Sequence, residues 1–384
     1  MTDVIIIGAG VAGATAAAVL GAKGIRVTLL DARDPVSRCF KAEKIEADQA
    51  ALLRKFGLLK SMLPVTGRIR AIQNAQRGKV LYSQPIEQYG IHYHDMVNIV
   101  RQGLPAKVDF RIGRVESIET GPERQRVRTN TGEELTARLL VVASGTAAQL
   151  CAPLGIHRRM IREKHSLAIG FDIASAREVA FPFDSVTYYP TGVANRIAYL
   201  TLFLIGRTMR ANLFLYRTSD ESWVRQFTRN PAELLEASLP GLTKITGPFR
   251  AEGRVECAAI HLYKAEQFLH PGLILIGDAF QSVCPSTGTG LSRVLTDVDV
   301  LTEHVPHWLD TPGMGLEKMR QFYDHPGKIA TDASSLGQAE YVRDASTSFS
   351  RRWVSQQVRL HANAWMRKVL PVKKPVDRME EILD

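Results

Sequence analysis

Three glycines near the N-terminus have the spacing of a phosphate-binding loop. Gly8, Gly10 and Gly13 form a GxGxxG pattern between the apolar run Val4 to Ile7 and a run of small, helix-favouring residues. Such a loop lets the backbone approach a pyrophosphate, and the N–H groups and dipole of the following helix attract the phosphate charge. The pattern therefore predicts a dinucleotide site. Its expected contacts are Gly8, Gly10, Val11, Ala12 and Gly13.

An acidic residue ends the next predicted strand. Asp31 follows the run Arg26 to Leu30, where a carboxylate can accept hydrogen bonds from ribose hydroxyls and disfavours a 2′-phosphate. The site therefore suits FAD or NAD. Ala32 is expected to line it, and the basic residues Arg38 and Lys41 are expected to reach its pyrophosphate.

A second glycine–acid pair lies far along the chain, after another apolar run. Leu273 to Ile276 precede Gly277-Asp278, and further motif positions follow at Pro285, Gly288, Gly290 and Asp297. This segment resembles the GD motif of the flavoprotein hydroxylases and their relatives. The resemblance implies that Asp278 bonds the ribityl chain of FAD and that Pro285 lies beside the flavin ring. The expected contacts in this segment are Gly277, Asp278, Pro285, Gly288, Thr289, Gly290 and Leu291.

The segment between these motifs also resembles that family, with one departure. The run Leu139 to Ala143 is followed by Ser144-Gly145, where most family members have Asp-Gly and flavin-dependent halogenases have a serine. We expect Ser144 and Gly145 to contact the cofactor. The halogenase signature WxWxIP is absent from the chain, so a halogenase is disfavoured.

The residues suited to substrate chemistry are histidines and tyrosines of the region between the motifs. A histidine acts as a base near neutral pH, and a tyrosine orients a phenol or a carbonyl. We predict catalytic roles for His261 and Tyr263, together with Pro285 beside the flavin. Weaker candidates are His165, Tyr188 and Tyr189. The cysteines are scattered without metal-ligand spacing, and no metal site is predicted.

The resemblance implies an FAD-dependent monooxygenase. Such an enzyme hydroxylates an aromatic or other apolar small molecule through a flavin C4a-hydroperoxide, with O2 as co-substrate and NAD(P)H as electron donor. The single dinucleotide fingerprint argues against a two-domain disulfide reductase. Two alternatives stay open: an alkene reductase that resembles geranylgeranyl reductases and acts on a lipid-like substrate, and a non-catalytic FAD-sensing or partner-dependent flavoprotein.

The elements that must position these residues indicate an α/β fold. We predict a Rossmann-type FAD-binding domain with an inserted β-rich substrate domain and a helical C-terminal region. The FAD-binding domain is expected to be discontinuous, over residues 1–165 and 262–320, with a β-rich portion around 62–92. The β-rich substrate domain is expected over 166–261, and the helical region over 321–384.

Composition and charge restrict location and partners. Hydrophobic residues make up 45% and charged residues 23%, which is typical of a globular protein and not of a disordered or membrane-spanning chain. The N-terminus has no basic leader, so a cytoplasmic location is expected. The net charge of +10 suits phosphate-bearing ligands or an anionic membrane surface, and no nucleic-acid partner is predicted.

Part of that positive charge lies in a predicted helix near the C-terminus. Residues 351–370 contain no acidic residue, and a helical projection gathers an apolar stripe on one side and arginines on the other. The stripe consists of Val354, Val358, Ala362, Trp365 and Val369. Such a helix either contacts anionic lipid or an acidic partner, or packs its stripe on the protein body and leaves its basic face in solvent. We favour the second interpretation.

Overall fold

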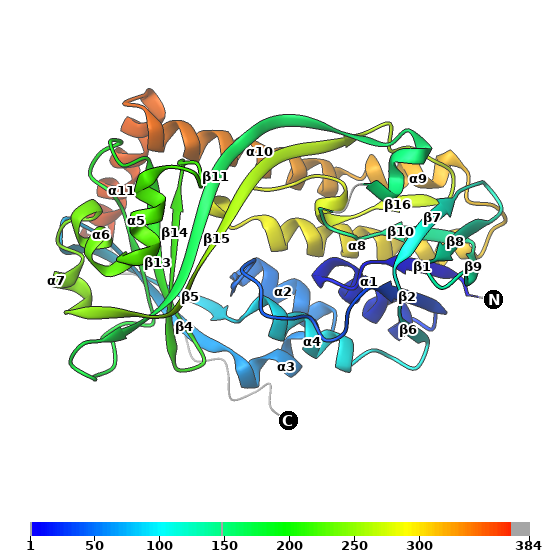
Figure 1. The fold of residues 1–384 in the computed structure, drawn as a ribbon, viewed down its shortest axis with the longest axis horizontal. Helices are drawn as coiled ribbons and strands as arrows, with labels where there is room; N and C mark the ends of the chain where they lie inside the picture. The colour runs from blue at the N-terminus through cyan, green and yellow to red at the C-terminus, as the bar shows by residue number, and fades with distance from the viewer. Residues whose placement is uncertain (1, 147–148, 370–384) are drawn as a thin grey trace. The chain divides into compact units, whose positions relative to one another are not determined.

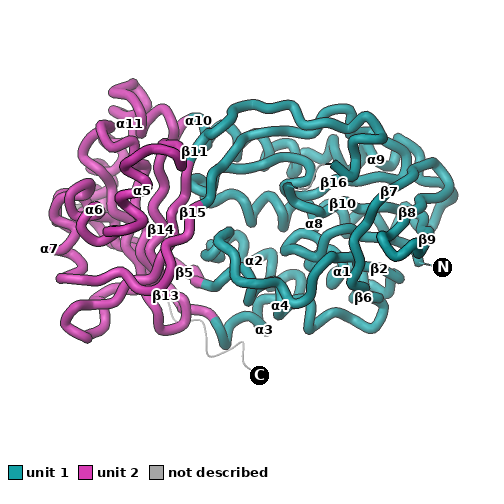
Figure 2. The backbone as a smooth tube through the Cα atoms, in the orientation of Figure 1, with its two compact units in different colours: residues 1–65, 91–166, 258–340 teal, residues 66–90, 167–257, 341–384 magenta. Residues whose placement is uncertain are grey.

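The structure is a computed structural model that describes residues 2–146 and 149–369. The chain divides into two compact units, each built from three separate segments (Figure 2). Unit 1 comprises residues 1–65, 91–166 and 258–340, and unit 2 comprises residues 66–90, 167–257 and 341–384. Residues 66–90, which we assigned to the FAD-binding domain, group with the β-rich unit in this division. The last part of the predicted helical region, 370–384, lies outside the described residues.

A five-stranded parallel sheet forms the centre of unit 1 (Figure 1). Its strands are, in order, β16 (Leu273–Leu275), β10 (Leu139–Val142), β1 (Val4–Ile7), β2 (Val27–Asp31) and β6 (Val108–Ile112). The continuous apolar runs form these strands because both faces of the sheet are covered, and every residue of β1 and β10 is buried. Parallel strands place their carboxyl ends at one edge, so the loops that carry the sequence motifs meet there.

Helices cover this sheet and frame its carboxyl edge. Helix α1 (Val11–Ala22) consists of small residues and packs against α4 (Tyr93–Gln102) and α8 (Gly290–Leu309) (Figure 1). The other helices of unit 1 are α2 (Ala47–Lys55), α3 (Leu59–Met62), α9 (Leu316–Tyr323) and the first part of α10 (Pro326–Thr347). The 3-10 turns are η1 (Leu63–Val65), η2 (Gln149–Leu154), η3 (Gly277–Ala279) and η4 (Pro285–Thr287).

A small antiparallel sheet and one short strand complete unit 1. The sheet consists of β7 (Val115–Glu119), β8 (Gln125–Thr129) and β9 (Glu134–Ala137). The turn at Asn130-Thr131-Gly132 joins β8 to β9, where Gly132 has the positive φ that such a turn requires. The short strand is β3 (Lys44–Ile45).

A mixed sheet forms the core of unit 2. The strands that contribute residues to unit 2 are, in order, β15 (Phe249–Glu266), β11 (His157–Ser175), β14 (Thr208–Leu215), β13 (Ile197–Ile205), β12 (Ser185–Tyr188), β4 (Gly67–Gln76) and β5 (Lys79–Gly90). Residues 157–166 of β11 and 258–266 of β15 belong to unit 1, as does β3, the eighth strand of this sheet. Helices α5 (Ser222–Arg229) and α6 (Pro231–Ser238) pack on it through Phe227 and Leu235, and α7 (Thr243–Thr246) follows. The predicted α/β architecture, with a Rossmann-type sheet, a β-rich insert and C-terminal helices, is confirmed.

The last described helix corrects our interpretation of the C-terminal stripe. Helix α11 (Arg351–Val369) packs on β5 and buries Leu360, whereas Val354, Val358 and Trp365 are 51%, 60% and 66% exposed. Leu360 lies on the side of the helix opposite the stripe, so that side faces the body. The stripe therefore does not pack on the described body. The side chain of Val369, which we placed in the stripe, lies outside the described residues. Within the described ranges no helix is long and apolar enough to span a bilayer.

Candidate functional site

The glycine loop after β1 fits tightly against the loop after β10. Gly8 has a φ of +97°, and a Cβ at this position would lie 2.6 Å from the carbonyl oxygen of Ala143. A Cβ on Gly13 would lie 1.8 Å from the carbonyl oxygen of Gly8. Both positions therefore require glycine, because backbone atoms cannot move aside as a side chain can. The loop is a cradle that only glycines can form.

The N-terminus of α1 is open toward this cradle. Gly10 is the N-cap residue and has no side chain to cap the helix, and the first turn holds no acidic residue. The hydroxyl of Tyr93 accepts a hydrogen bond from the N–H of Val11 at 3.3 Å. Helix N-termini of this kind attract phosphate through their N–H groups and dipole.

Asp31 lies at the end of β2 and faces the glycine loop. Its carboxylate accepts hydrogen bonds from the N–H of Ala9 at 2.7 Å and from the N–H of Arg33 at 3.1 Å. The guanidinium of Arg101 lies 3.1 Å from the same carboxylate and donates to the carbonyl oxygen of Ala9 at 2.8 Å. Asp31 and Arg101 thus fix the conformation of the loop on which the phosphate contacts depend.

Arg101 is a site residue that our sequence analysis missed. Its side chain is only 3% exposed, although it belongs to the helix α4 that otherwise buries apolar residues. It lies one helical turn after Val97, on the buried face of the helix. That spacing was the available signal, since an arginine on an apolar face requires polar partners.

The other residues predicted around the ADP half lie on the segment that follows β2. Ala32 and Arg38 are exposed there. The ammonium of Lys41 lies over the Tyr93 ring, 5.0 Å from its centroid, and is close enough to Asp278 to lower the pKa of that carboxyl. Of the two basic residues predicted to reach the cofactor, Lys41 is the one with contacts toward both motifs.

Ser144 and Gly145 follow β10, and Ser144 lines a small pocket. The pocket is also lined by Cys151, Arg158 and Ala279. Arg158 donates to the carbonyl oxygens of Gly145 and Thr146 at 3.0 Å and 2.6 Å. Burial raises the pKa of the Cys151 thiol to about 11, so this cysteine is a neutral wall of the pocket at physiological pH.

The GD segment begins with a left-handed glycine turn anchored to α8. Gly277 has a φ of +58°, and its N–H donates to the carboxylate of Asp297 at 2.8 Å. The next residue, Asp278, is partly buried, and burial raises the pKa of its carboxyl while Arg293, Lys41 and Arg158 lower it. A carboxylate surrounded by three cations is suited to accept hydrogen bonds from a polyol chain.

Behind this turn lies a buried network of opposite charges. Lys328 contacts Asp297 at 2.7 Å and Asp332 at 3.1 Å, and Arg293 contacts Asp332 at 2.8 Å. All four side chains are at most 9% exposed. Arg293 also donates to the carbonyl oxygen of Gln281 at 2.8 Å. The network ties the GD turn and α8 to α10, and only Asp297 of its members was part of the sequence motif.

The turn between η4 and α8 presents a second open helix N-terminus. Gly288 adopts a left-handed conformation with φ +70°, and Gln49 of α2 donates to its carbonyl oxygen at 3.0 Å. The hydroxyls of Thr287 and Thr289 lie 2.7 Å apart. No side chain caps α8, and its first turn carries no acidic residue. The dipole of α8 therefore favours negative charge in front of Gly290.

The predicted catalytic residues lie in different surroundings. Pro285 begins η4 and is partly buried. Tyr263 is buried, and its hydroxyl donates to the carbonyl oxygen of Asp278 at 3.0 Å. His261 is exposed, and its Nδ1 accepts from the N–H of Lys164 at 3.3 Å. The structure thus brings Tyr263 to the GD turn, while no described contact links the His261 ring to it.

The weaker candidates lie on β11, on β12 and directly after β12. His165 is fully buried. The Tyr188 hydroxyl donates to the carbonyl oxygen of Pro240 and accepts from the N–H of Gly78, both at 2.7 Å. Tyr189 donates to Asn74 at 3.4 Å, and burial raises its pKa. Both tyrosine hydroxyls thus have hydrogen-bond partners within the protein, as is usual for tyrosines with a structural role.

These surroundings fit an FAD molecule. Gly8 and Gly10 are partly exposed and carry no side chain, and the N-termini of α1 and α8 offer donors for anionic groups. In addition, the Nη2 of Arg293 is buried and has no hydrogen-bond partner within the described ranges. A buried donor of this kind is costly unless a ligand satisfies it.

Comparison with known families decides which dinucleotide the cradle serves. Residues 1–305 match a family model described as an FAD binding domain. The chain belongs to this family of FAD-binding monooxygenases. It is 25% identical over 325 residues to the ubiquinone hydroxylase UbiL of Rhodospirillum rubrum, a match that covers 79% of this chain and 72% of that protein.

Several solved structures of flavin-dependent enzymes have the same fold. The p-nitrophenol 4-monooxygenase PnpA of Pseudomonas putida matches with a TM-score of 0.76 and 17% identity, over 96% of this chain and 94% of that one. PqsL of Pseudomonas aeruginosa, in complex with 2-aminobenzoylacetate, matches with a TM-score of 0.69 and 17% identity, over 95% and 99%. The flavin-dependent brominase Bmp2 matches with a TM-score of 0.68 and 16% identity, over 96% and 90%. The predictions of the family, of FAD as cofactor and of an FAD-dependent monooxygenase are confirmed.

Proposed function

We propose that this monooxygenase hydroxylates an aromatic or quinone-like small molecule with O2, and that NAD(P)H supplies the electrons. The observation that carries the proposal is the position of Asp278, a partly buried carboxyl in the turn whose Gly277 N–H donates to Asp297 of α8. The substrate class is supported by the names of the relatives, which act on p-nitrophenol and ubiquinone. The single dinucleotide fingerprint suggests that the nicotinamide has no fold of its own.

The ADP half of FAD is assigned to the loops after β1 and β2. Gly8, Gly10 and Gly13 would admit the pyrophosphate, and the N–H of Ala12 would bind it. Val11, whose N–H donates to the Tyr93 hydroxyl, would border it. The remaining lone pairs of the Asp31 carboxylate would accept hydrogen bonds from the ribose hydroxyls, while Arg101 holds the carboxylate in its orientation. Residues predicted to border this half are Ala32, Arg38, Lys41, Ser144 and Gly145.

The ribityl and flavin half is assigned to the GD segment. Asp278 would bind the ribityl hydroxyls, and the N–H groups of Gly290 and Leu291 at the start of α8 would face the flavin edge. When bound and reduced, the flavin supplies the electrons and the O2 chemistry that hydroxylation requires. The α8 dipole would stabilise negative charge near Gly290, and the buried network behind the turn would hold both elements in place.

The residues predicted to be catalytic receive different roles. Burial raises the pKa of Tyr263 to about 12, so its hydroxyl is protonated at neutral pH and donates to Asp278. We therefore assign Tyr263 a positioning role and not that of a base. Pro285 is assigned to packing beside the flavin, and His261 remains the predicted proton acceptor.

The direct test is turnover with isotopically heavy O2. The purified holoenzyme is supplied with NADH or NADPH and a panel of phenols, anilines and quinone precursors, and the products are analysed by mass spectrometry. The proposal predicts one heavy oxygen atom in a hydroxylated product and substrate-stimulated NAD(P)H oxidation. Products without the label would refute it.

The same experiment separates the alternatives. An alkene reductase would saturate a prenyl-like double bond in the absence of O2. A sensing flavoprotein would bind FAD and show no substrate-dependent oxidation of NAD(P)H. Bromination of a phenol in the presence of bromide would indicate the chemistry of the brominase, although the WxWxIP signature is absent from this sequence.

A further inference from the structure

We propose that α11 is a docking helix for an anionic lipid bilayer. This inference is independent of the hydroxylase reaction, because it rests on the surface of unit 2 and not on the FAD site. It starts from the apolar stripe that the structure leaves exposed.

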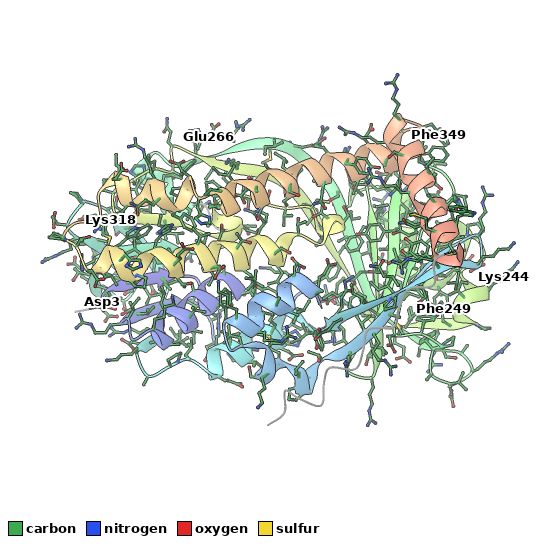
Figure 3. All side chains as sticks on the ribbon, turned by 180° about the vertical axis from the view of Figure 1, so that it is seen from behind. Asp3, Lys244, Phe249, Glu266, Lys318 and Phe349 are labelled. Atoms are coloured by element: carbon green, nitrogen blue, oxygen red, sulfur yellow. The ribbon has the colours of Figure 1, made fainter. Side chains whose placement is uncertain are left out.

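The exposed residues of the stripe lie on one side of α11. At about 100° per residue, Val354, Val358 and Trp365 project within about 40° of one another along the helix. Their exposed fractions are 51%, 60% and 66%. Met366 is 44% exposed, and Phe349 in the turn before the helix is 71% exposed (Figure 3). Apolar residues gathered in this way on one surface mark an interaction site.

The opposite side of α11 already has partners. Leu360 is 5% exposed, and the helix packs on β5. The guanidinium of Arg367 stacks on Tyr82 of β5, 5.5 Å from the ring centroid, and Arg359 stacks on Tyr341 at 5.4 Å. The helix is therefore anchored to unit 2 in an orientation that presents the stripe to the surroundings.

Charge identifies the occupant as an anionic bilayer. Residues 351–369 contain Arg351, Arg352, Arg359 and Arg367 and no acidic residue, and the nearest acid along the chain, Asp344, lies 3.9 Å from Arg352. A second copy of this helix would bring two basic surfaces together, which costs electrostatic energy. An anionic bilayer suits both properties. It receives the apolar stripe at the acyl boundary, and its headgroups attract Arg351, which is exposed and projects within about 60° of the stripe residues. The arginines that contact unit 2 add to the positive potential of this surface.

Trp365 is well placed to mark the interface. Tryptophan prefers the boundary between the headgroups and the acyl chains, and Trp365 is flanked by the basic residues of the same helix. Peripheral attachment would bring the enzyme to substrates that partition into lipid. The attachment itself requires no such substrate.

The test is flotation of the full-length holoprotein with vesicles. We expect it to float with phosphatidylcholine vesicles that contain ~30% phosphatidylglycerol and to stay in solution with phosphatidylcholine alone, because the arginines need anionic headgroups. High salt should weaken the flotation by screening these charges. The double variant Val358→Glu and Trp365→Glu should lower the vesicle partition coefficient ~tenfold or more.

Two controls separate docking from misfolding. Val179→Glu, which replaces another exposed residue of unit 2 that is 62% exposed, should float as the wild type does. The double variant should keep its FAD absorbance and melting temperature, because both side chains are exposed. Trp365→Phe should still float but should lose most of the lipid-induced blue shift in tryptophan fluorescence.

Each contrary outcome overturns the proposal. Wild-type protein that stays in solution with anionic vesicles excludes lipid docking. Equal flotation of the wild type and the double variant excludes α11 as the docking surface. A dimer that the double variant dissociates, in a protein that binds no vesicles, would identify a second copy as the occupant.

Discussion

At the residue scale, the site depends on charges that are paired away from water. Asp31 is held by Arg101 at one end of the site, and the turn that carries Asp278 is held by the network around Lys328 at the other. Neither Arg101 nor Lys328 is expected to touch the cofactor. Their role is to keep a carboxylate and a turn in position, because a buried ion pair is stable only when all its members are present.

Loss of Lys328 should therefore be far more costly than loss of a surface lysine. Lys328→Met leaves Asp297 and Asp332 without their buried cation and should lower the free energy of unfolding by about 3 kcal/mol or more. Lys55→Met breaks a pair of similar length, 2.6 Å to Asp299, but that lysine is 62% exposed. It should cost less than about 1 kcal/mol. Chemical denaturation that gives equal losses for the two variants would argue against the network.

Asp278 should reduce the stability of the FAD-free protein at neutral pH. Burial raises the pKa of its carboxyl above the usual 3.8, so the folded state resists ionisation. Below pH 3.8 the carboxyl is protonated in both states, and the penalty appears as the pH rises through the folded-state pKa. FAD-free Asp278→Asn should thus melt higher than the wild type at neutral pH, and this difference should disappear in acid. A variant that melts lower at neutral pH would contradict the assignment.

At the element scale, the position of α1 depends on one glycine. Gly13→Ala would place a Cβ 1.8 Å from the carbonyl oxygen of Gly8, so α1 must move away from the loop. We expect this variant to lose FAD and to melt at a lower temperature.

A second helical glycine provides the matched control. Gly337 of α10 is exposed and lies in an ordinary helical turn, and a Cβ added there would have no atom of a neighbouring element within 4 Å. Gly337→Ala should keep FAD and gain up to ~1 kcal/mol of stability from its helix propensity. Normal flavin content in Gly13→Ala would show that the close approach is not required for binding.

Local patterns account for the part of the site that the sequence predicted. The Gly8 to Gly13 loop and Asp31 were predicted from the glycine spacing and the apolar strands before them. The Gly277-Asp278 turn also follows an apolar strand, but its role was predicted from the resemblance to the GD motif. Arg101, Lys328 and Asp332 were missed because each has a partner far away in the chain: Asp31, Asp297 and Arg293, respectively. The orientation of α11 could not be predicted from the sequence either. A helical projection separates two faces but does not say which one packs on the protein body.

At the scale of the whole molecule, the FAD site of unit 1 is assembled from distant segments. The glycine loop, the Ser144-Gly145 turn and the GD segment come together because β1, β10 and β16 are parallel neighbours in one sheet. Binding of FAD should therefore slow amide hydrogen exchange in all of these segments together.

Hydrogen exchange with and without FAD should reveal this coupling. We expect slower amide exchange in residues 8–14, 31–33 and 277–291 together, because the cofactor is assigned to all three segments. Protection confined to residues 8–14 and 31–33 would indicate a ligand that occupies only the ADP half. Such a result would leave the GD segment without a role in binding.

The account depends most directly on the claim that Asp278 holds FAD at its flavin end. The measurement is a titration of FAD into flavin-free wild-type protein and into Asp278→Ala, with circular dichroism to verify that both are folded. We predict one FAD per chain for the wild type and an affinity ~100-fold or more weaker for the variant, which loses charge-assisted hydrogen bonds to the ribityl chain. A folded Asp278→Ala protein that binds FAD as tightly as the wild type would contradict the account.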